Sequence, residues 1–377
     1  MCKRPFPARQ CCIRSLQAAS ASQDPLLLRV ARGEKAERTP VWLMRQAGRY
    51  MKDFRKYSDV MMFRDRSESA EVAIELSLQP WRAFQPDGVI MFSDILTPLP
   101  ALGIEFDVIR NKGPKIESPI RSMEQVTALT PLADPDSSLP FIRQTLSSLR
   151  AEVGSAATVL GFIGAPWTLA AYAMEGGASK TISKTKSIMW HNPEIAHALL
   201  THITDAMIVY VCHQIDCGAQ VVQLFDSWAH HLTPQQYTEF SLPYAQRVIT
   251  AVTAKHPDTP LIFHANGGTG KLEFMGEMSR TADVIGLDHH VDMAIARKTL
   301  GADVKVQGNV DPIVLLGNEE VIRRDVQRCL QQAGPQGHIL NVGHGVDQQT
   351  PEENVKLFCD LARESASVFE GRTLVAA

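Results

Sequence analysis

The chain has 377 residues, of which 45% are hydrophobic and 21% are charged, and its formal net charge is −3. This composition suffices for one large α/β barrel or two ordinary domains, and it excludes a disordered or fibrous protein. Charges of both signs are interspersed, so we expect no nucleic-acid partner, and no apolar run reaches the roughly eighteen residues that a membrane span needs. The 7 cysteines lack zinc-finger or redox spacing, which is typical of reduced thiols in an intracellular compartment.

The first 23 residues differ in composition from the rest of the chain. They contain four basic residues, several serines and alanines, and no acidic residue. This pattern resembles an organelle transit peptide, plastid or mitochondrial, and the alternative is a disordered start. We therefore expect a transit peptide or disordered tail over residues 1–23 and one folded domain over residues 24–377.

Beyond the tail, apolar strands alternate with amphipathic helices. The predicted strands are residues 39–44, 88–92, 158–164, 220–225, 261–264, 284–287, 304–306 and 339–342. The predicted helices are residues 24–38, 67–84 with a kink at Pro80, 137–152, a helix from 165, 192–214, 233–255, a helix after 270, 293–300, 319–332 and a last helix from 350. About eight strand–helix units predict a single (β/α)₈ TIM barrel.

Local signals refine this outline. Thr233 and Thr350 are each followed three residues later by Gln or Glu, which predicts capping boxes at two helix starts. Residues 98–120 indicate a hairpin-like excursion from the barrel, and the glycine-rich residues 175–179 could serve as a lid.

Polar residues follow most of the predicted strands. In a parallel barrel the carboxyl ends of the strands converge on one face, so these residues share one site however far apart they lie in sequence. The residues at or just past predicted strand ends are Arg45, Asp94, Ser227, His264, Asp288, Gln307 and His344.

The segment Arg45-Gln-Ala-Gly-Arg49 places two fixed positive charges around a glycine. A guanidinium offers a planar fork of donors that suits a carboxylate or phosphate, so the two arginines could grip a polyanion. The alternative is that Arg45 and Arg49 form ion pairs on the rim of the fold.

Asp94 follows an apolar strand and has no basic neighbour in sequence. Because a buried carboxylate without a partner is costly, it either pairs with one of the arginines or waits for donors from a ligand. A carboxylate can accept several N–H groups at once, each such charge-assisted bond contributing roughly 1.5–3 kcal/mol. This is suitable for a ligand that offers several N–H groups.

Three further residues are candidates for polar contacts. Ser227 lacks the setting of a hydrolase nucleophile and more plausibly forms one hydrogen bond. Tyr172 lies beside the glycine-rich stretch as a wall or core residue, and His344 lies between two glycines that allow close approach to a ligand.

A metal or nucleotide cofactor is not expected. The segment His264-Ala-Asn266 lacks the thiolate of the His-x-Cys zinc sites found in some barrel methyltransferases, and we expect the adjacent pairs His230-His231 and His289-His290 to diverge. No glycine-rich phosphate-binding signature follows a strand, which argues against a nucleotide.

Six motifs together resemble the uroporphyrinogen decarboxylase family over nearly the whole chain beyond the tail. They are Pro40-Val-Trp-Leu-Met-Arg45-Gln-Ala-Gly-Arg49-Tyr50, Phe92-Ser-Asp94-Ile-Leu96, Gly164-Ala-Pro-Trp-Thr168, Leu224-Phe-Asp-Ser227, Val306-Gln-Gly-Asn-Val-Asp-Pro312 and Asn341-Val-Gly-His344-Gly345. The segments Leu78–Trp81 and Ser93–Pro100 look most like plant and cyanobacterial versions, which favours a plastid location; cytoplasmic and mitochondrial locations are the alternatives.

The resemblance implies a cofactor-free, metal-free homodimeric barrel that removes carbon dioxide from the four acetate groups of uroporphyrinogen III to give coproporphyrinogen III in haem and chlorophyll biosynthesis. It implies Asp94 and Arg45 as catalytic residues, with Asp94 stabilising a protonated pyrrole. The residues it implies for substrate binding are Arg45, Gln46, Ala47, Gly48, Arg49, Asp94, Tyr172, Ser227 and His344.

The chain also departs from the family pattern. Ser58 lies in a stretch where many members carry a further arginine, and His231 and His264 lie in stretches that differ from the common sequence. Two other functions stay open at this point. One is a barrel methyltransferase acting with a corrinoid partner, and the other is a porphyrinogen-binding protein without catalysis.

Overall fold

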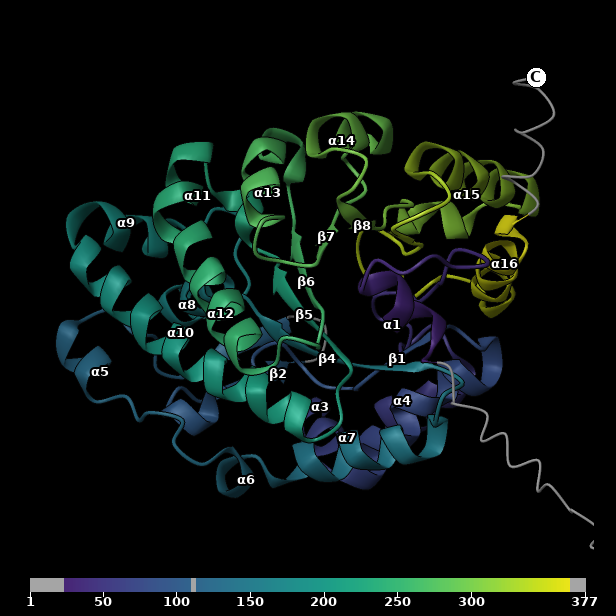
Figure 1. Ribbon diagram of the computed structural model, residues 1–377. Coiled ribbons are helices and arrows are strands. Elements are labelled where there is room, and N and C mark those ends of the chain that lie inside the picture. The colour runs from purple at the N-terminus through teal and green to yellow at the C-terminus, as the bar shows by residue number, and fades with distance from the viewer. Residues whose placement is uncertain (1–23, 110–112, 367–377) are drawn as a thin grey trace, which may run out of the picture.

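A curled parallel sheet forms the centre of the computed structural model, which describes residues 24–109 and 113–366 (Figure 1). The strand order is β1-β4-β5-β6-β7-β8-β9, and every neighbouring pair is parallel. The bounds are Gly88–Ile90 (β1), Thr158–Gly164 (β4), Val221–Asp226 (β5), Leu261–Ala265 (β6), Val284–Gly286 (β7), Lys305–Gln307 (β8) and His338–Ile339 (β9).

Residues 40–42 close the gap between the two edge strands. Val41 and Leu340 form a parallel bridge, and the Trp42 amide donates to the Leu340 carbonyl at 3.3 Å, just beyond β9. On the other side, the Asp87 amide donates to the Val41 carbonyl at 2.7 Å, next to β1. The predicted barrel is therefore confirmed as the fold class, with this segment at the eighth strand position.

The prediction of a regular strand over residues 39–44 is wrong. In this segment, side-chain oxygens accept hydrogen bonds from backbone amides that would otherwise pair with a neighbouring strand. The Leu43 amide donates to Gln46 Oε1 at 3.2 Å, and the Met44 amide donates to Asn341 Oδ1 at 3.0 Å. These side-chain acceptors satisfy the backbone N–H groups without the hydrogen bonds of a β-sheet, and an apolar sequence pattern alone does not reveal such acceptors.

Helices surround the sheet, and Figure 1 shows α10 beside α12 on one flank and α15 beside α16 on the other. The α-helices are α1 (Leu26–Ala31), α2 (Lys52–Ser58), α3 (Phe63–Glu68), α4 (Ala70–Phe84), α5 (Met123–Thr127), α6 (Pro135–Ser138), α7 (Pro140–Val153), α8 (Pro166–Glu175), α9 (Ser183–His191), α10 (Pro193–Asp216), α11 (Pro234–Phe240), α12 (Leu242–Lys255), α13 (Leu272–Met278), α14 (Met293–Leu300), α15 (Glu319–Ala333) and α16 (Glu352–Arg363). Short 3₁₀ turns are η1 (Pro100–Leu102), η2 (Ala229–His231), η3 (Gly268–Gly270) and η4 (Pro312–Leu316).

Some helix boundaries differ from those predicted. The helix expected over residues 67–84 is confirmed as α4, which begins three residues later because Ser69 has extended backbone angles and Glu68 ends α3; Pro80 lies within α4. Thr233 completes the predicted capping box of α11. Thr350 does not cap α16: the helix begins after Pro351, and the Thr350 hydroxyl is buried without a hydrogen-bond partner in the described part of the chain.

The strand pleat determines which side chains point into the barrel. Gln307 Nε2 of β8 donates to Gln223 Oε1 of β5 at 2.9 Å, and Trp42 Nε1 donates to Gln307 Oε1 at 2.8 Å. These strands are not neighbours in the sheet, so the three side chains meet inside it. Since alternate residues of a strand share a face, Phe225 also points inward, and so does His264, its register partner on β6.

The hairpin-like excursion is confirmed. Strands β2 (Phe106–Ile109) and β3 (Gly113–Ile116) form an antiparallel pair outside the barrel sheet. The glycine-rich stretch over residues 175–179 is fastened to this hairpin, because Gly177 forms a bridge with Lys115 and the Gly176 carbonyl accepts the amide of Ile116 at 3.0 Å. The lid suggested by the sequence is thus held in place from one side.

Among the described residues, only α10 is long and apolar enough to cross a membrane when length and composition alone are considered. Its most apolar window has a mean hydropathy of 1.5, and 61% of that window is buried inside the fold. The helix packs against α8, α9 and α12. This burial is typical of a core helix. The apolar window of α10 is nevertheless longer than the apolar runs that the sequence analysis predicted.

Candidate active site

The Arg45–Tyr50 segment lies directly after the closing segment of the barrel. Arg45 has a φ of 59°, which is uncommon for a residue with a side chain, and its side chain is exposed. A Cβ atom at Gly345 would overlap the Arg45 Cδ and Cγ atoms. The glycine therefore makes room for the arginine stem, and this contact fixes how Arg45 leaves the backbone.

The two arginines of this segment have no carboxylate partner among residues 24–109 and 113–366. None of the ion pairs formed between described residues includes Arg45 or Arg49. The segment is instead held through its backbone, since Arg55 Nη1 donates to the carbonyls of Arg49 and Tyr50 at 2.8 Å each. The ion-pair alternative fails for this part of the chain, and both charges stay available to a ligand.

The residues between the arginines act as scaffold. Gln46 is buried, and its Nε2 donates to the Gly88 carbonyl at 3.0 Å while its backbone carbonyl accepts the Tyr50 hydroxyl at 2.7 Å. Ala47 and Gly48 are half-buried, and a Cβ atom at Gly48 would lie 3.0 Å from the Arg45 carbonyl. Their predicted contacts with substrate stay predictions.

Asp94 follows β1 at the same end of the barrel and is half-buried. Its carboxylate accepts the Leu96 amide at 2.9 Å, and the Thr97 hydroxyl accepts the Asp94 amide at 3.2 Å. Burial raises the pKa of Asp94, whereas the Leu96 amide and the positive charge of Arg45 act in the opposite direction. The carboxylate is thus fixed by its own turn and lies close enough to Arg45 to feel its charge.

Tyr172 projects from α8 and is half-buried beside the loop after β5. Its ring centroid lies 3.9 Å from that of Trp228. Burial and the charge of Asp94 raise the pKa of Tyr172 to about 12, so the phenol is a neutral hydrogen-bond donor at ordinary pH. Ser227 precedes Trp228 and is half-buried, and its hydroxyl makes no hydrogen bond to any described residue.

A buried carboxylate that the sequence analysis did not single out joins α8 to the loop after β5. Asp226, the last residue of β5, accepts the Thr168 hydroxyl at 2.7 Å and the Ser241 hydroxyl at 2.5 Å. Thr168 Oγ1 in turn accepts the Trp228 amide at 3.1 Å. Burial raises the pKa of Asp226 to about 6. The Phe-Asp-Ser motif indicated Asp226, but its partners come from α8 and the start of α12.

His344 lies between two glycines, and at each of them neighbouring residues of the folded chain leave no room for a side chain. A Cβ atom at Gly343 would overlap the His289 backbone, just as one at Gly345 would overlap Arg45. Burial and the charge of Arg45 lower the pKa of His344 to about 4, so the imidazole is neutral at ordinary pH. Both glycines thus make close packing contacts, and the predicted close approach of a ligand to His344 stays a prediction.

His264 points into the barrel from β6 and is buried. Its ring lies 5.9 Å from that of Phe225, and its Nδ1 has no hydrogen-bond partner among the described residues. A Cβ atom at Gly286 would lie 3.0 Å from that Nδ1, so only glycine leaves room for the ring. The family departure at His264 therefore lies on the inner wall, where burial lowers the histidine pKa to about 4.

The adjacent histidine pairs do not diverge as predicted. The rings of His230 and His231 lie 4.0 Å apart, and so do those of His289 and His290. Both pairs lie outside strands and α-helices, where the alternation argument does not apply. No group of three or more His, Cys, Asp or Glu side chains within residues 24–109 and 113–366 is arranged to hold a metal ion.

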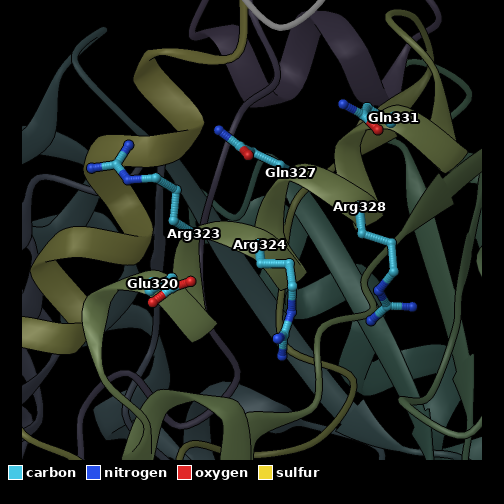
Figure 2. Close-up of a pocket in the computed structure, with 6 residues that line it drawn as sticks. All are labelled: Glu320, Arg323, Arg324, Gln327, Arg328 and Gln331. Carbon is cyan, nitrogen blue, oxygen red and sulfur yellow. The ribbon is translucent and has the colours of Figure 1, made fainter.

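A second cluster of arginines lines a hollow on α15, far along the chain from these residues (Figure 2). Arg323 pairs with Glu319 at 2.8 Å, Arg328 with Asp325 at 2.8 Å, and Arg324 with Asp325 at 3.3 Å. Figure 2 shows the three guanidiniums pointing in different directions. Because these charges are already paired at the surface, this hollow is a weaker anion site than the Arg45–Arg49 segment.

The structure thus brings four predicted residues together, because Arg45 acts electrostatically on Asp94, Tyr172 and His344. Ser227 lies next in sequence to Trp228, whose ring contacts that of Tyr172. Fold and site together define a (β/α)₈ barrel protein whose carboxyl-end face offers the guanidinium of Arg45 near the carboxylate of Asp94, with Arg49 four residues further on, a set suited to a polycarboxylate with N–H donors.

Comparison with known proteins identifies the family. The sequence model described as "Uroporphyrinogen decarboxylase (URO-D)" matches residues 22–365. A uroporphyrinogen decarboxylase of Crocosphaera subtropica is 57% identical over 345 residues, covering 91% of this chain and 97% of that protein. The same enzyme of a Picosynechococcus species is 56% identical, covering 93% and 99%. The chain belongs to the uroporphyrinogen decarboxylase family.

Solved structures support the fold alone. A methyltransferase from Methanosarcina mazei superposes with a TM-score of 0.77 at 18% identity, covering 91% of this chain and 99% of that one. A B12-independent methionine synthase from a Shewanella species gives a TM-score of 0.53 at 13% identity, covering 81% and 89%. At this identity the likeness carries no information about the reaction.

Proposed function

We propose that this chain is a carboxy-lyase that converts uroporphyrinogen III to coproporphyrinogen III. In each of four rounds, the bond between an acetate methylene and its carboxylate breaks, carbon dioxide leaves, and a proton converts the methylene to a methyl group. Family membership supports the reaction. The observation that carries the proposal is Asp94, a half-buried carboxylate without an ion-pair partner among the described residues, within the field of Arg45.

The role of Asp94 follows from the electron flow. The electrons left by carbon dioxide need a sink, and a pyrrole protonated on a ring carbon provides one as a cation. An ionised Asp94 would accept pyrrole N–H groups and stabilise this cation as it develops. Burial raises the pKa of Asp94, and the Leu96 amide and the charge of Arg45 oppose that shift, so these two groups favour the ionised form that this role needs.

The remaining residues would bind the substrate's carboxylates. Arg45 and Arg49 offer planar forks of donors, and the neutral side chains of Tyr172, Ser227 and His344 offer hydrogen bonds to acetate and propionate groups. Arg45 could also deliver a proton, but a guanidinium is a poor acid, so a bound water or the reacting carboxylic acid is the better donor. The reaction needs no cofactor in this account.

The direct test is anaerobic incubation of the chain with uroporphyrinogen III, with and without a metal chelator, followed by separation of the products by their number of carboxyl groups. We expect stepwise loss to a four-carboxyl product that is insensitive to the chelator. Tight binding without release of carbon dioxide would instead favour a porphyrinogen-binding protein. Failure both to bind and to react would favour a methyltransferase that acts with a corrinoid partner.

A plastid location and a homodimer are two finer proposals. The relatives named above are cyanobacterial, which agrees with a plastid-derived lineage, and residues 1–23, which would direct import, lie outside the described residues. Fusing these residues to a fluorescent protein tests import. The homodimer rests on the family resemblance, and sedimentation velocity at several protein concentrations tests it.

A further inference from the structure

Arg66 is a buried guanidinium inside a cage of three aromatic rings. It lies on α3, its exposed fraction is 7%, and its Cζ atom lies 5.4 Å from the ring centroids of both Phe54 and Phe63 and 5.7 Å from that of Phe92. Phe54 belongs to α2, and Phe92 follows β1, two residues before Asp94. The cage thus shares a segment with the proposed catalytic carboxylate.

No carboxylate neutralises this cation among the described residues. Its only hydrogen bond there is a long one, from Arg66 Nε to the Met62 carbonyl at 3.4 Å, so its terminal nitrogens have no partner. By contrast, Arg64, two residues earlier on the same helix, pairs with Glu68 at 2.5 Å and with Glu105 at 3.2 Å. These terminal nitrogens are not fully buried, so they stay open to water or to a bound anion at the edge of the cage.

Arg49 is held next to this cage, because its carbonyl accepts Arg55 Nη1 at 2.8 Å and Arg55 follows Phe54 on α2. Burial and the positive charge of Arg49 lower the pKa of Arg66, while the negative charge of Asp59 acts in the opposite direction. The repulsion between the two guanidiniums therefore exceeds the attraction that Asp59 exerts on Arg66. A carboxylate bound there would remove the repulsion and would satisfy the free donors of both side chains at once.

We propose that Arg66 is a third carboxylate-binding residue of the active site, which holds one side-chain carboxylate of the substrate together with Arg49. This rests on the proposed function, because it takes the ligand to be a polycarboxylate tetrapyrrole. Arg66 would replace the carboxylate contact that Ser58, in place of a further arginine, leaves in doubt. The phenylalanine cage orients the guanidinium and keeps it from turning away to solvent.

The competing role is purely structural, with Arg66 as a cationic support between α2, α3 and the segment after β1. Arg66→Met separates the two roles, because methionine is a flexible apolar side chain that can fill an aromatic cage without a charge. Arg66→Lys keeps the charge and loses the planar fork. Arg64→Met is the matched control, since it removes a neighbouring arginine that is already paired with carboxylates.

Steady-state decarboxylation of uroporphyrinogen III gives the first readout. We expect KM to rise about 10- to 100-fold in Arg66→Met, as for loss of a charge-assisted hydrogen bond, with little change in kcat. Arg66→Lys should fall between the wild type and Arg66→Met, and Arg64→Met should match the wild type. An unchanged KM in Arg66→Met, with or without a lower melting temperature, would overturn the proposal while the proposed function stands.

Thermal stabilisation by mellitate, an aromatic hexacarboxylate that cannot be decarboxylated by this route, gives the second readout. This test is independent of turnover, so it remains decisive even if the chain does not act on uroporphyrinogen. We expect mellitate to raise the melting temperature of the wild type and of Arg64→Met, and to raise that of Arg66→Met much less. Equal stabilisation of all three proteins would show that Arg66 does not contact bound carboxylates.

Discussion

Single residues of this barrel are placed by contacts that span distant segments, and Gly345 is the clearest case. A side chain at Gly345 would displace the flexible stem of Arg45, whereas one at Gly343 would overlap the backbone of His289. The two glycines are two residues apart in sequence, yet substitution of each is expected to affect a different property of the protein. The first protects the position of a proposed catalytic group, and the second protects the fold.

This difference yields a prediction. We expect Gly345→Ala to reduce kcat/KM by about 10- to 100-fold, because a shift of roughly 1 Å in a positioning group has this order of effect, with a nearly unchanged unfolding midpoint. Gly343→Ala should lower the free energy of unfolding. Gly270→Ala is the control, since a Cβ atom there meets nothing within 4 Å. Equal behaviour of the first two variants would contradict this account.

Buried titratable residues predict how stability depends on pH. Burial lowers the pKa of His264 and that of His338 to about 4 each, so the unfolded chain takes up protons first as the pH falls below about 6.5. Asp226 acts in the opposite direction: because its folded pKa is raised to about 6, protonation favours the folded state as the pH falls. Burial also lowers the pKa of His231 and that of His344 to about 4, and it raises the pKa of Asp94. The four histidines together outweigh the two carboxyl groups.

We therefore expect the free energy of unfolding in urea to fall between about pH 6.5 and pH 4, by a few kcal/mol in total. In Asp226→Asn the opposing contribution of that residue is absent, so the fall should be steeper. Unfolding curves measured at intervals across this range test both statements. A free energy that rises toward pH 4, or the same slope in both proteins, would show that these groups do not control the pH dependence.

At the scale of elements, the sequence predicted regular pieces well and irregular pieces poorly. Strand β4 (Thr158–Gly164) and helix α14 (Met293–Leu300) have the predicted bounds, because each is a continuous apolar or amphipathic run between strong breakers. The segment over residues 39–44 has the same apolar signal but forms one bridge. Some of its backbone amides donate to side chains such as that of Asn341, almost three hundred residues away in sequence.

Helix caps show the same limit, since Thr233 and Thr350 look alike in sequence. The Thr233 hydroxyl accepts the Gln236 amide at 3.3 Å, whereas the Thr350 hydroxyl is buried and makes no hydrogen bond to a described residue. We expect Thr233→Ala to lower the free energy of unfolding by about 1 kcal/mol and Thr350→Val to leave it unchanged or higher. Urea midpoints test the pair, and an equal loss in both would contradict the assignment of caps.

At the scale of the whole molecule, side chains cross the barrel interior and join segments distant in sequence. Trp42, Gln307 and Gln223 form one hydrogen-bonded chain from the closing segment through β8 to β5. The sequence placed Gln307 at a strand end but gave no sign of its partners. The same holds for the cage of Arg66, whose three rings come from α2, α3 and the segment after β1.

This chain of side chains yields a prediction for the whole fold. We expect Gln307→Leu to lower the free energy of unfolding by about 2–4 kcal/mol, because the Trp42 Nε1–H and Gln223 Oε1 would both be buried without a partner. Chemical unfolding followed by tryptophan fluorescence measures the loss. A change below about 0.5 kcal/mol would show that the crossing contacts do not stabilise the barrel.

The sequence indicated a site residue only where the type and position of that residue were sufficient to suggest its role. Motif and strand-end position indicated Arg45, Asp94 and His344, and a place beside the glycine-rich stretch indicated Tyr172. In the folded barrel, the charge of Arg45 acts on the other three residues. The roles of Asp226 and Arg66 depend on burial and on neighbours from several elements. No spacing rule contains that information, so these residues emerge only from the folded chain.

The most direct test of the account is the rate of carbon dioxide release at saturating uroporphyrinogen III for the wild type and for Asp94→Asn, an isosteric change that removes the negative charge. If Asp94 stabilises the developing pyrrole cation, the rate should fall by about 10²–10³-fold or more, with an unchanged unfolding midpoint. A variant that retains the wild-type rate would contradict the central role of this carboxylate and move the chemistry to another residue.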